Sequence, residues 1–320
     1  MLPLLSWGCA EQAPPLAQGE APPRADSRFA LAPEQKALGG VESYVTQPGD
    51  TLLDVAMRYD LGYTQLAAAN RDTDPWVPGA GKRVALPAFY LLPEGERRGI
   101  VVNVAQQRLY YFPPGGKAVE TFPIGTSVEG RATPVGVTRI TAKREHPIWY
   151  PPPSIREEKP ELPGAVPAGP DNPLGDYAFN LGWPGYLIHG TNKPYGIGRN
   201  VSHGCIQLYP DDIKRLFREV PVGTPVRIVD EDVAVAWIGD DLYLAAYPSK
   251  KQAEELGVHK KMTPALPSDI RKRALKAAGP RRSRIDWKIV EKVGIERSGI
   301  PTLITRPVVT RPKMEVTSSS

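Results

Sequence analysis

The sequence predicts an α+β protein in which a small strand–helix–helix–strand unit precedes a mostly β domain with few helices. Pro and Gly occur 36 and 30 times in 320 residues, which excludes long uninterrupted helices and coiled coils. Apolar residues recur at helical spacing within residues 43–87, and strand-like runs bounded by Gly, Pro or polar residues dominate from residue 98 onward. We therefore expect four segments: a leader and linker (1–40), the small unit (43–87), the β-rich domain (98–230) and a C-terminal hairpin and extension (231–320).

The composition excludes several classes of protein. Apolar residues make up 41% and charged residues 23%, which is ordinary for a globular chain and too apolar for a disordered one. The net charge of +5 is spread along the chain without a basic cluster denser than residues 271–284, so nucleic-acid binding is not indicated. Two cysteines, Cys9 and Cys205, cannot make a disulfide framework. No apolar stretch approaches the roughly 18 residues of a membrane-spanning helix, which predicts a soluble body.

The N-terminus contains the first of these cysteines. Residues 1–10 read MLPLLSWGCA and resemble the tail of a secretion signal, although a basic n-region and a full apolar h-region would need a start further upstream. Gly8 and Cys9 resemble the cleavage and lipidation site of a bacterial lipoprotein, while Ser6 and Trp7 depart from that pattern. Two interpretations stay open: a lipid-anchored Cys9, with membrane contact only in that case, or an incidental cysteine in a disordered leader.

The small unit is predicted from its apolar spacing and its turn residues. Within residues 43–87, a short strand is followed by a first helix that Asp50 or Thr51 can cap. A second helix follows at residues 63–70, and a closing strand at residues 83–86. A unit of this size is small for a free-standing core, so we expect it to be tightly packed.

Parts of this unit resemble a LysM module. The resemblance rests on YVTQPGDTL at residues 44–52, on AAN ending at Asn70 and on VPGAG at residues 77–81. That family binds N-acetylglucosamine chains of peptidoglycan or chitin, which implies a groove whose loop backbone meets the N-acetyl groups. The implied glycan-binding residues are Gly49, Asp50, Thr51 and Asn70.

A structural alternative accompanies these assignments. Gly49 and Asp50 also suit a turn and a helix cap. Trp76 is either a stacking surface for a sugar or a lid on a small core.

The β-rich domain opens with two strand-like runs joined by a short connection, as in a hairpin. The expected strands lie at residues 100–104, 108–112, 121–124, 136–140, 186–189 and 226–229. The clearest helix is expected at residues 210–220, where Pro stands first and two acids follow in the first turn. Apolar residues at positions i, i+3, i+4 and i+7 give this helix one buried face.

The remaining segments are less specific. Residues 233–247 predict another hairpin, which we expect to pack on the β-rich domain. A basic helix-like stretch at residues 268–278 and a strand-like stretch at residues 302–309 predict a surface helix and a disordered end. Residues 147–173 form a Pro-rich loop that is either a lid over the functional site or a passive surface loop.

The chemistry concentrates around Cys205. Two of the four histidines, His189 and His203, lie shortly upstream of it. A lone cysteine is most often a small buried hydrophobe, but Gly204 leaves access to this thiol, and the following helix start offers a positive dipole end that favours a thiolate. A cysteine nucleophile needs a base and donors for the oxyanion, and spacing alone does not decide which histidine is the base. Two His and one Cys are too few ligands for zinc, so we expect no metal and no cofactor.

Residues 188–213, IHGTNKPYGIGRNVSHGCIQLYPDDI, closely resemble the signature of L,D-transpeptidases with a YkuD-like catalytic domain. The sequence TPVG at residues 133–136 also fits that family. The resemblance implies that Cys205 is the nucleophile and that His189 accepts and donates its proton. The residues assigned to the pocket and the oxyanion site are His203, Gly204, Ser202 and Gly190. The pairing with a LysM module points to the Gram-negative envelope branch, in the periplasm or cell envelope.

One residue departs from the family pattern. That branch usually carries Arg after Cys-Ile, where this chain has Gln207. An arginine suits a substrate carboxylate because its planar fork donates two hydrogen bonds, whereas Gln is neutral. Arg199 either compensates as a substrate-binding residue or is a solvated loop cation.

The activity implied by the resemblance is acyl transfer in cell-wall biogenesis. A tetrapeptide stem of peptidoglycan is transferred through a Cys thioester to an amine, which is a diaminopimelate side chain or a lysine of an envelope lipoprotein. One alternative is a cysteine endopeptidase of the NlpC type, but its catalytic histidine lies downstream of the cysteine, where this chain offers only His259. Another alternative is a non-catalytic peptidoglycan-binding protein that has kept the fold.

Overall fold

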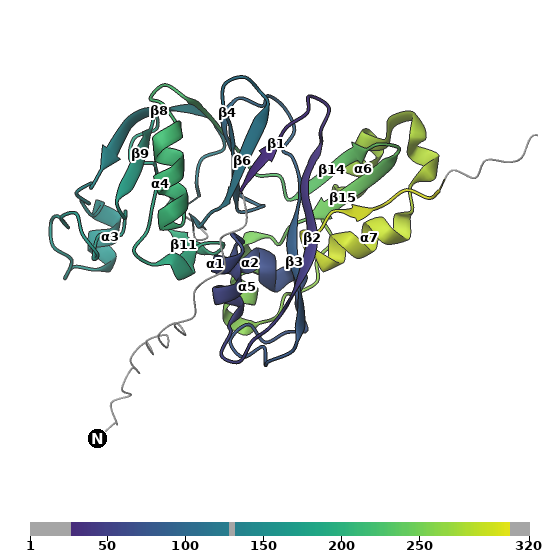
Figure 1. Cartoon of the computed structure of the whole chain (residues 1–320), viewed down its shortest axis with the longest axis horizontal. Coiled ribbons are helices and arrows are strands. Elements are labelled where there is room, and N and C mark those ends of the chain that lie inside the picture. Colours follow the sequence, from purple (N-terminus) through teal and green to yellow (C-terminus); the bar gives the residue numbers. More distant parts are fainter. Residues whose placement is uncertain (1–26, 128–131, 308–320) are drawn as a thin grey trace, which may run out of the picture.

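A nine-stranded sheet forms the centre of the protein in the computed structural model, which describes residues 27–127 and 132–307 (Figure 1). The strand order is β1-β6-β5-β4-β13-β8-β9-β10-β12. Neighbouring strands are antiparallel except for the parallel pairs β4–β13 and β10–β12. The strands are β1 (Arg28–Ala30), β4 (Gly99–Asn103), β5 (Arg108–Phe112), β6 (Ala118–Pro123), β8 (Gly136–Glu145), β9 (Tyr177–Leu181), β10 (Leu187–His189), β12 (Ile206–Gln207) and β13 (Pro225–Val229).

The central strands are buried on both faces, which explains their continuous apolar sequences. One face packs against α4 (Pro210–Glu219), whose apolar side chains Ile213 and Leu216 enter the main core. The opposite face contributes Val101 and Tyr110 to a second cluster with Leu38. The α+β class predicted from the sequence is therefore confirmed.

The strand–helix–helix–strand order is also present. It consists of β2 (Ala37–Val45), α1 (Leu52–Arg58), α2 (Tyr63–Ala69) and β3 (Arg83–Leu91), which we call the N-terminal unit. Thr51, rather than Asp50, caps α1: its hydroxyl accepts from the Asp54 N–H at 3.1 Å, and the Asp54 carboxylate accepts from the Thr51 N–H at 3.1 Å. The unit's core contains Leu52, Val55, Leu66 and Val84.

The segment expected to be leader and linker contributes to the sheet. Strand β1 pairs antiparallel with β6, and β2 begins at Ala37, within the range that we expected to end at residue 40. The difference has a physical reason, because β1 covers the otherwise unpaired edge of β6. Cys9 and its lipidation hypothesis lie outside the described residues.

The C-terminal part up to residue 307 is more regular than we expected. Strands β14 (Val233–Ile238), β15 (Asp241–Ala246) and β16 (Thr302–Leu303) form a sheet, and α6 (Ile270–Ala278) and α7 (Trp287–Glu296) pack on it around a separate core (Figure 1). We call these elements the C-terminal unit. The remaining elements are β7 (Thr126–Ser127), α3 (Pro153–Glu158), β11 (Asn200–Ser202), α5 (Lys250–His259) and the short 3-10 helices Pro194–Gly196 and Gly279–Arg284.

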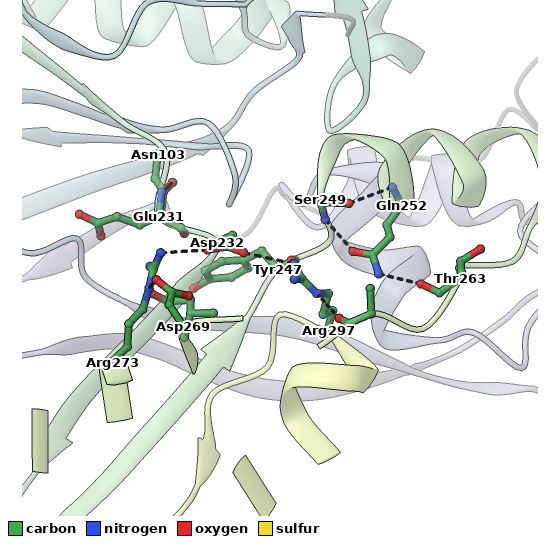
Figure 2. A network of polar contacts seen from close by, with 12 residues as sticks. Asn103, Glu231, Asp232, Tyr247, Ser249, Gln252, Thr263, Asp269, Arg273 and Arg297 are labelled. Carbon is green, nitrogen blue, oxygen red and sulfur yellow. Dashed lines mark hydrogen bonds and ion pairs between the residues drawn. The ribbon is translucent and has the colours of Figure 1, made fainter. Parts of the chain in front are cut away.

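A polar network ties the C-terminal unit to the central sheet (Figure 2). Asn103 of β4 exchanges two hydrogen bonds with the Glu231 backbone, at 3.1 and 3.0 Å. Arg273 and Arg297 both reach the Asp232 carboxylate, at 3.3 and 3.4 Å. In the parts of the chain that the structure describes, no helix has the length and apolar character needed to cross a membrane.

Candidate active site

His189 ends β10, and Cys205 immediately precedes β12, the parallel neighbour of β10 in the sheet. The register pairs Ile188 with Ile206 and His189 with Gln207. Both isoleucines are fully buried in the main core, so strand alternation turns Cys205, Gln207 and His189 toward the other face. All three side chains line the same cavity there.

This cavity has a volume of about 910 Å³, which is large enough for a peptide segment. The motif of residues 188–213 contributes much of the lining, including most of residues 191–199. The Pro-rich loop of residues 147–173 also lines the cavity, through Trp149, Tyr150 and α3. The loop that sequence alone could not assign therefore borders the candidate site.

His189 is held in one orientation. Its ring is 3% exposed, and Nδ1 lies 2.6 Å from the Gly190 carbonyl oxygen. With Nδ1–H donating to that carbonyl, Nε2 is the ring's acceptor. Burial lowers the pKa of His189 to about 4, so the imidazole is neutral at neutral pH.

Gly190 supports this histidine rather than an oxyanion. Its carbonyl accepts from His189, and its N–H donates to the Tyr177 carbonyl at 3.0 Å, so that N–H is already engaged. A Cβ added at Gly190 would lie 3.0 Å from the Ile213 side chain on α4. The absence of a side chain lets the chain pass close to α4 just after β10 ends at His189.

The Cys205 thiol is protonated at rest. Its Sγ lies 3.8 Å from the Gly185 carbonyl oxygen, to which the thiol donates. Burial raises the pKa of Cys205, and a backbone contact from Leu187 opposes that effect in part. We expected a helix N-terminus to favour the thiolate, and the raised pKa of Cys205 is opposite in direction to that expectation; α4 begins at Pro210, after β12 and two further residues.

Two hydroxyl groups hold the backbone beside Cys205. Thr133 Oγ1 donates to the Gly204 carbonyl at 2.9 Å, and Ser202 Oγ donates to the Cys205 carbonyl at 2.6 Å. Gly204 has a φ of +111°, a conformation that favours glycine. In a planar trans peptide the C=O and the N–H point in opposite directions, so the Thr133 contact fixes the direction of the Cys205 N–H. The sequence indicated a turn at Thr133 but not this contact.

His203 faces the loop at residues 147–173. Its Nε2 lies 3.0 Å from the Glu158 carboxylate on α3, and its side chain is 31% exposed. The loop itself is held by the buried Asn172, whose amide donates to the carbonyls of Pro147 and Pro167 at 2.7 and 3.0 Å. His203 thus connects the motif to a cavity wall, whereas His189 belongs to the sheet.

Gln207 and Arg199 both line the cavity. The backbone N–H and C=O of Gln207 bond to Gly125 at 3.0 and 2.9 Å, which leaves its side chain toward the cavity. The Arg199 guanidinium lies 5.2 Å from the centre of the Tyr63 ring of the N-terminal unit. Arg199 is half-buried, and its guanidinium also lies beside α5, where a Cβ added at Gly257 would be 3.3 Å from Nη2.

The residues predicted to bind glycan do not line this cavity. The Asp50 carboxylate accepts from Tyr44 Oη and from the Gln47 N–H, both at 2.7 Å, and pairs with Arg58 at 3.3 Å. The Asn70 side chain bonds to the Ala85 N–H and C=O at 2.7 and 2.8 Å. These contacts, together with the Thr51 cap, hold the N-terminal unit together.

Gly49 and Trp76 remain accessible in the same unit. Gly49 has a φ of +86° and open space around the position of a Cβ. Trp76 is 41% exposed, and its ring stacks on Tyr63 with centroids 6.4 Å apart. One region of the indole is therefore covered and another is open, and the stacking of a sugar on Trp76 stays a prediction.

Over residues 27–127 and 132–307, no group of three or more His, Cys, Asp or Glu side chains is arranged to hold a metal ion. His259, the downstream histidine required by the endopeptidase alternative, ends α5 and is not among the residues that line the cavity.

Comparisons with known proteins agree with the motif. The model of the L,D-transpeptidase catalytic domain, YkuD, matches residues 97–228. A probable L,D-transpeptidase ErfK/SrfK of Escherichia coli is 46% identical over 216 residues, which are 64% of this chain and 68% of that protein. The corresponding protein of Salmonella typhimurium is 38% identical over 291 residues, or 87% of this chain and 91% of that one. The chain belongs to the L,D-transpeptidase family and is an acyltransferase of that class.

A solved L,D-transpeptidase of Enterococcus faecium is also similar, with 25% identity and a TM-score of 0.33. The similarity covers 42% of this chain, which spans half the length of that structure. The LysM resemblance of residues 43–87 stays a prediction.

Proposed function

We propose that this chain is a peptidoglycan L,D-transpeptidase in which Cys205 is the nucleophile and His189 is its proton acceptor and donor. The observation that carries the proposal is that His189, at the end of β10, and Cys205, immediately before the parallel strand β12, line one cavity of about 910 Å³. The tautomer set by the Gly190 carbonyl leaves His189 Nε2 as an acceptor, which is what a general base requires. His203 faces Glu158 instead, so we assign it to the pocket wall.

The first half-reaction is acylation. Cys205 Sγ attacks the carbonyl that precedes the terminal D-alanine of a tetrapeptide stem, while His189 takes the thiol proton. The Cys205 N–H, oriented by the Thr133 contact, stabilises the oxyanion. The tetrahedral intermediate then breaks its C–N bond, His189 returns the proton to the leaving amine, and a thioester and free D-alanine result.

The second half-reaction is transfer. An acceptor amine attacks the thioester, His189 takes the amine proton and returns it to the departing sulfur, and an amide and the free thiol result. A diaminopimelate side chain or a lysine of an envelope lipoprotein suits this step. The chemistry uses only groups of the chain and its two substrates.

Mass spectrometry after incubation with a tetrapeptide or a carbapenem tests this assignment. We expect an acyl adduct on Cys205 in the wild-type protein and none in Cys205→Ala. His189→Gln should acylate at least 100-fold more slowly, the usual size of a general-base contribution. Val222→Ala, at an exposed position outside the cavity, is the matched control and should acylate normally.

The outcomes separate the alternatives. An adduct that persists in Cys205→Ala would refute the nucleophile. A wild-type protein that binds cell wall but never forms an adduct would support the non-catalytic alternative. Products formed from tetrapeptide with and without an added amine distinguish transfer from hydrolysis.

We also propose that the N-terminal unit binds glycan strands through loop backbone and the open region of Trp76. Support comes from the strand–helix–helix–strand order, the accessible Gly49 backbone and the exposed indole. In a pulldown on purified sacculi, Trp76→Ala should bind less than wild type, whereas Val77→Ala, which is 75% exposed, should not. Equal binding of all three proteins would argue against this role.

Substrates of this kind place the enzyme in the periplasm or cell envelope. Whether a lipid anchors it depends on Cys9. Mass spectrometry of the native protein would detect a diacylglyceryl group there, and an unmodified Cys9 would refute anchoring.

A further inference from the structure

Arg199 differs from the other cations that line the acyl-transfer cavity. Arg144, Lys159 and Lys193 are exposed, whereas Arg199 is half-buried. Within the described parts of the chain, no carboxylate pairs with its guanidinium. A partly desolvated cation without a counter-ion is costly alone and binds an incoming carboxylate more strongly than a solvated one does.

Tyr63 holds this guanidinium from outside the catalytic domain. It begins α2 of the N-terminal unit and is 1% exposed. Its ring centre lies 5.2 Å from Arg199 Cζ, within the range of a cation–π contact. The Tyr63 ring also stacks against the Trp76 ring, so it contacts both Trp76 and the Arg199 guanidinium.

The backbones of the two segments are joined at the same point. The Tyr63 and Thr64 N–H groups, at the start of α2, donate to the Ile197 and Gly198 carbonyls at 3.3 and 2.9 Å. A Cβ added at Gly198 would lie 2.2 Å from the Tyr63 nitrogen, so only glycine permits this approach. The residues immediately before Arg199 are thereby attached to α2.

We infer that Tyr63 is a positioning residue for acyl transfer: its ring holds Arg199 at the cavity wall, where the guanidinium binds a carboxylate of the donor stem peptide. The inference rests on the proposed function, because it needs a peptide donor in this cavity. It also accounts for a neutral Gln207 beside Cys205, since Arg199 supplies a cation in the same cavity. The N-terminal unit then has a part in donor binding besides any contact with glycan.

Steady-state kinetics with a tetrapeptide donor test the inference. Tyr63→Leu removes the π face and keeps an apolar side chain, and it should raise KM for the donor about 3- to 30-fold with little change in kcat, the range that a cation–π contact provides. Tyr63→Phe keeps the ring and should resemble wild type. Arg199→Gln should raise KM at least as much, and the double variant Tyr63→Leu/Arg199→Gln should be no worse than Arg199→Gln alone.

A donor whose free carboxylates are amidated provides the decisive control. With this donor, wild type, Tyr63→Leu and Arg199→Gln should share one raised KM. If Tyr63→Leu fails to fold, the test rests on the KM values of Arg199→Gln and Tyr63→Phe with the tetrapeptide donor and with the amidated donor. An Arg199→Gln penalty that survives amidation overturns the carboxylate contact, and a Tyr63→Leu protein with wild-type KM overturns the positioning role.

Alkylation of Cys205 by iodoacetamide separates this role from a structural one. The rate should be the same in wild type, Tyr63→Leu and Arg199→Gln. A Tyr63→Leu variant that loses alkylation and kcat together would have a damaged site, which contradicts positioning through Arg199. A wild-type enzyme that never forms an acyl adduct would instead contradict the proposed function itself.

Discussion

Burial moves the pKa of Cys205 and that of His189 in opposite directions. It raises the pKa of the thiol and lowers that of the imidazole to about 4, because the charged form of each group loses solvation. The resting pair is therefore a neutral thiol and a neutral imidazole. We infer that the proton moves when the substrate is attacked, and that a separated thiolate does not accumulate beforehand.

The neutral burial of His189 predicts a pH dependence of stability. The folded-state pKa of about 4 lies below the unfolded value of 6.5, so between these pH values the unfolded chain binds a proton that the folded chain does not. The free energy of unfolding should fall as pH decreases from 7 to 4, by about 3 kcal/mol from this residue. Urea denaturation of wild type and His189→Gln at both pH values measures the difference. If the free energy of unfolding fell equally in wild type and His189→Gln between pH 7 and 4, His189 would not be buried as a neutral imidazole.

Thr133 predicts a second effect at the residue scale. Its hydroxyl holds the Gly204 carbonyl at 2.9 Å, and Thr133→Ala removes a hydrogen bond of about 1–1.5 kcal/mol. We expect acylation of Cys205 to slow roughly tenfold, since the Cys205 N–H is no longer held toward the oxyanion. Thr133→Ser keeps the hydroxyl and should restore the rate. Equal acylation rates in Thr133→Ala and wild type would show that the Cys205 N–H keeps its orientation without the Thr133 hydroxyl.

At the scale of the elements, the contact between α2 and the segment at Gly198 joins the N-terminal unit to the cavity wall. Gly198 has a φ of +75°, and Gly223 has a φ of +90° with open space around it. Both Ala variants suffer the same strained backbone, about 1–2 kcal/mol. Only Gly198→Ala also places a Cβ 2.2 Å from the Tyr63 nitrogen.

We therefore expect Gly198→Ala to lower the free energy of unfolding by about 1–3 kcal/mol more than Gly223→Ala does. Urea denaturation of the two variants gives the comparison. Gly198→Ala should also raise the donor KM, because the displaced segment carries Arg199. Equal losses in the two variants would mean that α2 moves aside at little cost.

Local patterns predicted the elements whose causes are local. Pro210, the acids after it and the apolar spacing predicted α4, which the structure places at Pro210–Glu219. The motif around Cys205 predicted where the cavity lies, because Gly204, Cys205 and strand β12 are contiguous in the chain. The pairing of β1 with β6 was missed, since a three-residue edge strand carries no periodicity of its own.

Contacts between distant segments could not be predicted in the same way. Thr133 reaches Gly204 across 71 residues, and Tyr63 meets Arg199 from another unit of the protein. No spacing rule connects such pairs, because their approach depends on how the sheet and the N-terminal unit pack together. The sequence therefore singled out the candidate nucleophile and its histidine, which remain predictions, but not the residues that contact the backbone and the cation around them.

At the scale of the whole molecule, Arg297 joins the end of α7 to the segments that flank β14 and β15 in the C-terminal unit (Figure 2). Its side chain is 6% exposed and donates to the Tyr247 and Ala265 carbonyls at 2.7 and 3.1 Å. It also pairs with Asp232, which keeps Arg273 as a second partner. Replacing Arg297 would leave two carbonyls without this donor, while the charge of Asp232 would stay compensated.

Arg297→Met should consequently lower the free energy of unfolding by about 1–3 kcal/mol, mainly because the buried Tyr247 carbonyl loses its donor, whereas Ala265 is exposed and its carbonyl can bond to water. Lys292→Met is the matched control, because Lys292 is 69% exposed and its 3.8 Å pair with Glu296 contributes under about 1 kcal/mol. Hydrogen exchange should show faster opening of α6 and α7 in Arg297→Met while α4 keeps its protection. If α4 opens to the same extent, the C-terminal unit and the catalytic domain unfold together, and Arg297 stabilises the whole cooperative structure rather than the C-terminal unit alone.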